Sequence, residues 1–387
     1  MDPQAFTSSS AGRLVKSVAG YWTFVPNPLP PSFELNHNLF VAVSAAERSI
    51  GQLAGVGQTL PNPHLLIGSF VRREAVLSSR IEGTHATLTD LVLFEQSESV
   101  EQDVPDVREV SNYVRAMEYG LKRQRTTGVG LTLIREMHQL LMKDVRGGDK
   151  TPGNFRTMQN FIGRTGRLED ATYVPPSPLD LPIALEAFQE YLRAPSTLPP
   201  LVRIALIHYQ FEAIHPFNDG NGRIGRLLIT LLLCFDSILP MPLLYLSAYL
   251  ERHRQEYYRR LLAVSQRGEW NEWIGFILEG VRSEAADAVR RGSALLGLQR
   301  QYHAKAQKAR ASSLVFALID ELFTNPAVTV ASAAKTLKVT ARAAAQNVER
   351  LIKLGILQEA TGRKRGRVFV AREVIQVLER RGELEEE

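Results

Sequence analysis

The segment His215–Arg226, with the sequence HPFNDGNGRIGR, restricts the possible folds of this 387-residue chain more than any other segment. A strongly apolar stretch, Leu201–Ile214, comes directly before it, and a second one, Gly222–Phe235, overlaps its end. Both stretches have helical patterns, so the glycine-rich loop joins two helices and lies at the N-terminus of the second. Backbone N–H groups at a helix N-terminus lack intrahelical partners and, together with the helix dipole, attract anions. The segment therefore predicts a phosphate-binding loop inside a helical domain.

The side chains around this loop have the chemistry of phosphate transfer. Gly220 and Gly222 let the backbone turn sharply and approach a ligand closely. His215 can act as a general base near neutral pH, and Asp219 offers the hard oxygen that magnesium prefers when it bridges phosphates. Asn221 can donate a hydrogen bond to a phosphate oxygen.

Two arginines complete the pattern. Arg223 and Arg226 are three residues apart, so both project from one side of the first helical turns. Two fixed guanidinium groups on that side can hold successive phosphates of a nucleotide. Each residue taken singly could cap a helix or face solvent, but the whole ordered set favours a nucleotide site.

This segment fills every position of the signature HPFx[D/E]GNGRxxR, and the chain therefore resembles the Fic family. The resemblance runs from Tyr21 to about Arg282. It implies a mainly α-helical fold, a Fic-type helical bundle with a β-hairpin flap. It also implies transfer of AMP from ATP to a Ser, Thr or Tyr hydroxyl of a protein target, or of the protein itself. Pyrophosphate would be released, and Mg²⁺ would be the cofactor.

The resemblance assigns roles by position. His215 would deprotonate the target hydroxyl, Asp219 would hold the metal, and the loop Gly220–Gly222 would stabilise charge on the α- and β-phosphates. Arg223 would contact the β-phosphate and Arg226 the γ-phosphate. The nucleotide-binding residues expected in this segment are Asp219, Gly220, Asn221, Gly222, Arg223, Ile224, Gly225 and Arg226.

A β-hairpin flap precedes the motif in similar proteins and pairs with the target peptide as an added strand. The turn-rich segment 153–178, with the runs 153–163 and 172–178, fits this flap. Ile162 and Gly163 are the candidates for contact near the nucleotide and the target backbone. An ordinary surface hairpin is the alternative.

The adenine side of the nucleotide is expected downstream of the motif, within the run EYYRRLLAVSQRGEW. Tyr257 and Tyr258 could offer an aromatic wall to adenine, and Gln266 could offer an amide. Adjacent residues on a helix face different directions, so one of the two tyrosines is expected in the core.

An inhibitory element is also expected. Ser78, Glu82 and Gly83 fit the family's inhibitory pattern [S/T]xxxE[G/N], and Ser78 and Glu82 share one helix face because they are four residues apart. The resemblance implies that Glu82 pairs with Arg226 and keeps it from the γ-phosphate, which would make the protein autoinhibited. In some relatives the same glutamate supports removal of AMP, and the sequence leaves both roles open. A chance helix end is the other alternative.

The basic C-terminal part has the pattern of a winged helix. Helices are expected at 330–337 and 341–354, with Thr340 capping the second, and short strands at 356–358 and 367–370. Residues 300–387 carry 16 Lys and Arg against 10 Asp and Glu, a net charge of +6. DNA binding is one interpretation. A protein-interaction or dimerisation module is favoured, because the second helix is rich in alanine and has few side chains that could read bases.

The chain is expected to divide into an N-terminal helical region with the inhibitory helix (1–110), a Fic core (111–300) and a winged-helix domain (312–382). Residues 1–35 show little periodicity and are expected to be irregular. Further helices are expected at 64–82, with Gly83 directly after the helix end, and at 107–125, 131–143, 248–266 and 271–300.

Composition places few further limits on function. The single cysteine, Cys234, rules out a disulfide framework and favours a reducing compartment such as the cytoplasm. The N-terminal residues lack an apolar signal core. The apolar stretch Leu227–Leu250 contains Asp236 and two prolines, so it predicts a core helix and a turn rather than a membrane span.

Two other functions compete with AMP transfer. One is a Fic relative that uses a different phosphate donor, such as a kinase-like or phosphocholine-transferring member. The other is a DNA-binding regulator that uses the Fic body as a nucleotide sensor. The intact motif favours AMP transfer with ATP and a hydroxyl-bearing protein as partners, and a homodimer is an expectation at the family level only.

Overall fold

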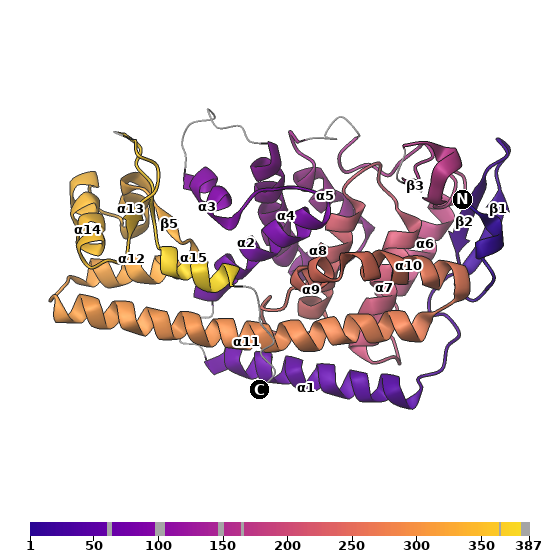
Figure 1. Cartoon of the computed structure of the whole chain (residues 1–387), viewed down its shortest axis with the longest axis horizontal. Helices are drawn as coiled ribbons and strands as arrows, with labels where there is room; N and C mark the ends of the chain where they lie inside the picture. The colour runs from indigo at the N-terminus through magenta and orange to yellow at the C-terminus, as the bar shows by residue number, and fades with distance from the viewer. Residues whose placement is uncertain (60–63, 97–104, 146–150, 164–165, 364, 381–387) are drawn as a thin grey trace. The chain divides into compact units, whose positions relative to one another are not determined.

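The structure is a computed structural model of the chain, and it describes residues 1–59, 64–96, 105–145, 151–163, 166–363 and 365–380. Fifteen α-helices and three small sheets lie within these residues (Figure 1), which confirms the mainly α-helical class. The chain packs as two compact units, one of residues 1–51 with 115–284, the other of residues 52–114 with 285–387. The predicted three-part division of the chain stays a prediction.

The first unit is a helical body around one buried helix. Its helices are α5 (Leu131–Leu141), α6 (Leu181–Arg193), α7 (Pro200–Ile214), α8 (Asn221–Phe235), α9 (Ser247–Arg252), α10 (Arg254–Arg267) and parts of α1 (His37–Thr59), α4 (Pro105–Thr127) and α11 (Trp270–Lys308). Every residue of α7 from Leu201 to Ile214 is buried, as its strongly apolar sequence predicts, and the burial includes the polar side chains within it. Proline in its first turn suits a helix start, because the missing N–H would have no partner there. α7 and the following α8 place the motif between them.

An N-terminal hairpin replaces the irregular segment that was expected for residues 1–35. β1 (Gly12–Lys16) pairs antiparallel with β2 (Trp22–Pro26), after a short 3₁₀ helix at Pro3–Ala5. β2 is covered on both faces, so its sequence WTFVP lacks the alternation by which strands are recognised. The Gln210 side chain of α7 donates to the Asn27 carbonyl at 2.9 Å and ties the hairpin to the core.

A helix expected at 248–266 is two helices. α9 ends at Arg252 and α10 begins at Arg254, with His253 between them at φ −108° and ψ 31°. The ring of His253 packs on Tyr249, with 4.5 Å between ring centroids. No glycine or proline marks this break, so local patterns could not predict it. α11 continues eight residues past its expected end at 300, to Lys308.

The second unit contains the C-terminal helices and the helix that carries the expected inhibitory residues. Its elements are α2 (His64–Ile81), α3 (Leu88–Gln96), α12 (Ser313–Thr324), α13 (Val330–Leu337), α14 (Ala341–Lys353), α15 (Arg372–Glu379) and a sheet of order β5-β7-β6 (Ala327–Val328, Phe369–Val370, Gln358–Glu359). α13 and α14 lie where the sequence predicts them, and the Thr340 side chain accepts from Ala343 N at 3.3 Å as the expected cap. The winged-helix assignment itself stays a prediction.

Helix α2 is bonded to the C-terminal ends of two later helices in this unit. Ser69 Oγ donates to the Phe323 carbonyl at 2.6 Å, and Arg73 Nε donates to the Leu378 carbonyl at 3.0 Å. A Cβ on Gly68 would lie 2.6 Å from the Thr324 carbonyl oxygen, so only glycine fits this approach. These contacts satisfy carbonyls that a helix leaves without intrahelical partners, and they join α2 to α12 and α15.

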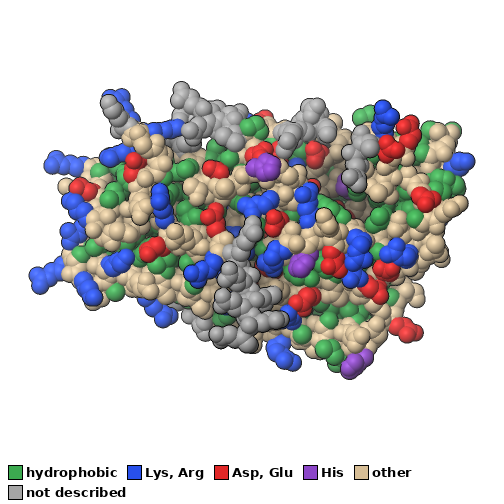
Figure 2. Space-filling view, viewed as in Figure 1, with side chains coloured by type: hydrophobic (Ala, Val, Ile, Leu, Met, Phe, Trp, Pro, Cys, Tyr) green, Lys and Arg blue, Asp and Glu red, His purple; other side chains and the backbone are tan. Residues whose placement is uncertain are grey.

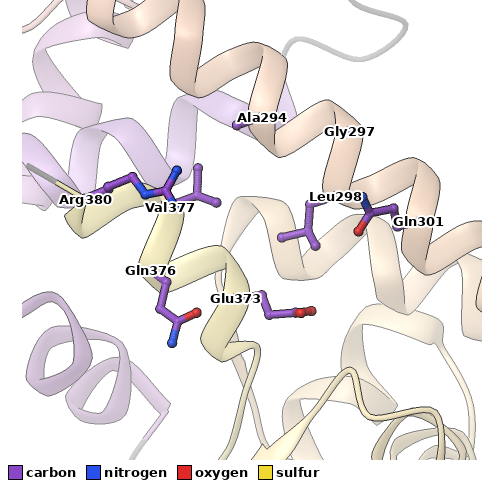
Figure 3. Close-up of a pocket in the computed structure, with 8 residues that line it drawn as sticks. All are labelled: Ala294, Gly297, Leu298, Gln301, Glu373, Gln376, Val377 and Arg380. Carbon is purple, nitrogen blue, oxygen red and sulfur yellow. The ribbon is translucent and has the colours of Figure 1, made fainter. Parts of the chain in front are cut away.

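The surface of the second unit has a region rich in Lys and Arg and a pocket lined by two of its helices. Lys and Arg side chains gather over α12–α14 on the face shown in Figure 2. A pocket of about 440 Å³ lies between α11 and α15, with Leu298 of α11, Glu373 and Gln376 of α15, and Arg380 directly after α15 on its walls (Figure 3). Among the helices that the structure describes, none combines the length and apolar character that a membrane span requires.

Candidate active site

The motif begins where α7 ends, and the backbone there turns back at a histidine. His215 has φ 48° and ψ 60°, the left-handed region that histidine enters more readily than most side chains. Its Nδ1 lies 3.3 Å from the Glu212 carbonyl oxygen. Because a carbonyl only accepts hydrogen bonds, Nδ1 carries the proton of the neutral ring, and the Nε2 lone pair can accept a proton.

Asn221 holds the loop in shape. Its Oδ1 accepts from Phe217 N at 2.8 Å and its Nδ2 donates to the Phe217 carbonyl at 2.9 Å. The side chain thus forms a bridge across the loop, and its expected donation to a phosphate stays a prediction. Asn221 is 2% exposed, so the bridge is buried. The backbone N–H of Asn221, at the start of α8, is the second group by which this residue would bind a nucleotide.

Gly220 and Asp219 prepare the start of α8. Gly220 precedes the helix at φ 76°, as expected for a sharp glycine turn, and its N–H donates to Asp219 Oδ1 at 2.6 Å. The same oxygen lies 3.7 Å from Arg223 Nη2. No group of three or more metal-ligating side chains occurs among the described residues. A single carboxylate beside a phosphate site still fits magnesium, which binds proteins through one or two carboxylates and takes its other ligands from phosphates and water.

The two arginines are buried guanidinium groups at the start of α8. Arg223 is 4% exposed and Arg226 is 2% exposed. Burial and the charge of Arg226 lower the pKa of His208 to about 3, so this neighbouring ring is neutral. Charges at this depth interact strongly with anions because the surroundings screen them weakly.

Ile224 and Gly225 pack within the helical body, and their expected place among the nucleotide-binding residues stays a prediction. Ile224 is fully buried. A Cβ on Gly225 would overlap Glu212 Oε1 and lie 3.2 Å from His208 Cε1, so α7 and α8 can approach each other only at a glycine. His208 Nδ1 also lies 3.1 Å from the Gly225 carbonyl.

Comparison with known proteins agrees with this geometry. Residues 40–122 match the family described as "Fic/DOC family N-terminal", and residues 129–233 match the family described as "Fic/DOC family". The second match contains the whole segment His215–Arg226. The chain contains the N-terminal domain and the core domain of the Fic/DOC family.

Curated relatives carry the name protein adenylyltransferase Fic. The one from Drosophila erecta is 31% identical over 148 residues, which is 38% of this chain and 26% of the relative. The one from Culex quinquefasciatus is 33% identical over 129 residues, 33% of this chain and 23% of the relative. The matched part is thus about a quarter of the length of these relatives.

Solved structures share the Fic fold. A Fic family protein from Desulfovibrio desulfuricans G20 superposes with a TM-score of 0.56 at 19% identity, covering 89% of this chain and 98% of that one. A form of Fic-1 from C. elegans superposes with a TM-score of 0.50 at 21% identity, covering 65% of this chain and 73% of that one.

The expected Fic flap is present as a short hairpin. β3 (Ile162–Gly163) pairs antiparallel with β4 (Ala171–Tyr173), after the 3₁₀ turn Leu168–Asp170, and Ile162 is opposite Tyr173. Ile162 is 42% exposed, so it is accessible for the predicted contact. Pairing of this flap with a target strand stays a prediction.

The residues expected at adenine separate as the sequence suggested. Tyr257 is 1% exposed and lies in the core, where its OH is 2.9 Å from His208 Nε2. Tyr258 is 42% exposed, and its predicted contact with adenine stays a prediction. The Gln266 carbonyl accepts from Thr7 N at 2.8 Å, while its side chain remains a candidate for adenine.

Sequence patterns did not identify the side chains from other segments that bond to the backbone of the Fic motif. Arg156 is 3% exposed, and it donates from Nε to the His215 carbonyl at 2.9 Å and from Nη2 to the Pro176 carbonyl at 2.6 Å. Burial lowers its pKa to about 10, so it remains charged at neutral pH. Asn160 Nδ2 donates to the Phe217 carbonyl at 2.9 Å. Both side chains lie in the run 153–163, which the sequence predicts only as part of the flap.

His138 of α5 is the third residue that contacts the Fic motif and that the sequence did not indicate. Its ring stacks on that of Phe217, with 3.7 Å between centroids and 4° between planes. Burial lowers the pKa of His138 to about 4. A histidine at an apolar position of a helix does not indicate which distant loop it will contact, so the sequence could not predict this packing.

The expected inhibitory residues lie at the end of α2. Ser78 is fully buried, α2 ends at Ile81, and Gly83 follows at φ 98° as the expected glycine after a helix end. Glu82 N donates to the Ser79 carbonyl at 3.0 Å. Ser78 and Glu82 belong to the second unit and Arg226 to the first, and pairing of Glu82 with Arg226 stays a prediction.

Proposed function

We propose that this protein is a protein adenylyltransferase that moves AMP from ATP to a Ser, Thr or Tyr hydroxyl of a protein. The observation that carries the proposal is the orientation of His215, whose Nδ1 faces a carbonyl and whose Nε2 can therefore accept a proton next to the start of α8. The relatives named protein adenylyltransferase Fic support this reaction class.

The reaction would proceed by in-line attack on the α-phosphorus. His215 Nε2 takes the proton as the target oxygen forms its bond to that phosphorus. The bond from the α-phosphorus to the oxygen bridging to the β-phosphate breaks, and pyrophosphate leaves. Mg²⁺ held by Asp219 would neutralise phosphate charge when bound.

The start of α8 would hold the triphosphate. N–H groups in the first turn of α8 point out of the helix and suit the α- and β-phosphates. Arg223 and Arg226 would contact the β- and γ-phosphates with bidentate hydrogen bonds. Both guanidinium groups are already buried in place, so little side-chain freedom is lost on binding.

The proposed enzyme is autoinhibited through Glu82. A carboxylate paired with Arg226 would exclude the γ-phosphate and leave the α-phosphate misaligned, and a displacement of about 1 Å can lower a rate about a hundredfold. The same carboxylate could instead orient a water that removes AMP from a modified protein. The target protein, homodimer formation and DNA contact by the C-terminal region belong to this proposal as expectations.

Labelling of the full chain with α-labelled ATP and Mg²⁺ tests the proposed inhibition by Glu82. Glu82→Gly should label itself faster than the wild-type protein, and Glu82→Gly with His215→Ala should not label. Glu95→Gly is a matched control, because Glu95 is engaged with Arg72 at 2.7 Å on the same unit. Equal, slow labelling of wild type and Glu82→Gly, with no label in the His215 variant, would refute inhibition by Glu82. The proposed transfer reaction would remain supported.

A further inference from the structure

A buried histidine packs against the Fic loop and is not itself among the expected ligand-binding residues. His138, on α5, is 1% exposed, and its ring lies flat against the ring of Phe217. Apolar packing alone would be served equally well by phenylalanine at this position. The polar contacts of the ring therefore decide what the imidazole contributes.

Both ring nitrogens are engaged, and their partners determine where the proton lies. Gly153 N–H points at Nδ1 over 2.8 Å, and a backbone N–H can only donate, so Nδ1 is the acceptor. The proton of the neutral ring is then on Nε2, which lies 2.9 Å from the Asp219 carbonyl oxygen and donates to it. His138 thus joins two backbone segments in one tautomer.

The first segment is the peptide between Asp219 and Gly220. Its carbonyl is held by His138, and its N–H, on the opposite side of the same planar group, donates to Asp219 Oδ1 at 2.6 Å. Fixing the carbonyl therefore fixes the N–H and, through it, the carboxylate expected to take magnesium. Gly220 allows this peptide to lie close to the end of α5, because a Cβ there would lie 2.9 Å from Met142 Sδ.

The second segment is the base of the flap. Gly153 has φ 80°, and its carbonyl accepts from Arg135 Nε at 2.7 Å. A Cβ on Gly153 would lie 3.0 Å from Gln139 Cβ, so this backbone is pressed against α5. One side of α5 therefore carries both the start of the flap and the metal-binding end of the loop.

We propose that His138 is a positioning residue for the transfer reaction, which orients the Asp219 carboxylate for Mg²⁺ through the peptide it holds and sets that peptide relative to the flap base. The inference rests on the proposed function. His138 acts through Asp219 and contacts neither nucleotide nor target. Partners that orient metal ligands in this way typically change metal affinity about 10- to 100-fold when removed.

Three substitutions separate the contacts of His138. His138→Gln keeps a donor near the position of Nε2, His138→Asn keeps an acceptor near Nδ1, and His138→Phe keeps the stacked ring and removes both polar contacts. Each is made in the full chain with Glu82→Gly. Calorimetry then gives the Mg²⁺ concentration at which a non-hydrolysable ATP analogue reaches half of its maximal affinity gain, and thermal unfolding gives stability.

We expect His138→Asn and His138→Phe to require about tenfold more Mg²⁺ or more, and His138→Gln to stay within about threefold of the parent. A loss of stability in all three variants with an unchanged Mg²⁺ requirement would overturn the proposal, because that is the behaviour of a core residue. Labelling from α-labelled ATP is measured in parallel. Absence of labelling in the Glu82→Gly parent would refute the proposed function, whereas the Mg²⁺ titration would still decide the role of His138.

Discussion

The Asn221 carboxamide is bonded twice to the backbone of Phe217, at 2.8 and 2.9 Å, and this pair closes the loop that follows His215. Both ends of the amide are used, so no other side chain of similar size reproduces the bridge. The loop is consequently shaped before a nucleotide arrives.

Asn221→Asp tests this bridge. The variant keeps the acceptor for Phe217 N but replaces the donor with an oxygen that faces the Phe217 carbonyl, and repulsion should shift the loop. We expect the rate of auto-labelling in a Glu82→Gly background to fall about a hundredfold, because a small misplacement of reacting groups has that effect. A rate within a factor of two of the parent would show that the bridge does not shape the site.

Gly225→Ala should lower the free energy of unfolding by about 1–3 kcal/mol. The added methyl group would overlap the buried Glu212 carboxylate and crowd His208, which is held by two hydrogen bonds. Gly275→Ala is the matched control, because Gly275 also lies within a helix and a Cβ there meets nothing within 4 Å. Urea unfolding of both variants should show destabilisation at position 225 and equal or greater stability at position 275.

Arg156→Met removes a buried side chain that donates hydrogen bonds to the backbone around the Fic loop. The carbonyls of His215 and Pro176 would each lose a charged donor, at a cost of about 1–3 kcal/mol for each buried group left without one. We expect a lower midpoint in urea and slower labelling. Arg156→Lys should recover only part of both effects, because an ammonium cannot reproduce the planar fork. Full recovery by lysine would assign the role to charge alone.

Stability should decrease as the pH falls from about 6.5 toward 4. Burial holds the pKa of His208 at about 3 and that of His138 at about 4, whereas both would be near 6.5 in the unfolded chain. The unfolded state then binds more protons in this window, so acid favours unfolding, by at most about 1.4 kcal/mol per pH unit for each ring. His208→Gln should flatten the dependence of the urea midpoint on pH. An unchanged slope in that variant would contradict the assignment.

The sequence predicts the contiguous part of the candidate site and gives no sign of the side chains that fold against it. His215, Gly220 and Arg223 lie in one string whose chemistry can be recognised without a structure. Arg156 and His138 come from other segments, and only tertiary packing brings them under the loop. Apolar patterns correctly indicated the helices around the site, because burial of one face leaves a regular signal.

Burial separates residues that the sequence treats alike. The side chains of Ile224 and Tyr257 are buried, whereas Tyr258, next to Tyr257 in the sequence, is exposed. The hairpin at Gly12–Pro26 was missed because its second strand is covered on both faces and loses the alternating pattern.

The central claim is that His215 and the start of α8 direct a protein hydroxyl to the α-phosphorus of ATP. Purified Glu82→Gly protein is incubated with Mg²⁺ and ATP labelled at either the α or the γ position, with the double variant Glu82→Gly, His215→Ala as the control. Transfer of the α label to a hydroxyl, found by mass spectrometry as an AMP adduct and absent from the control, is the predicted result. Transfer of the γ label, or an adduct that persists without His215, would contradict it.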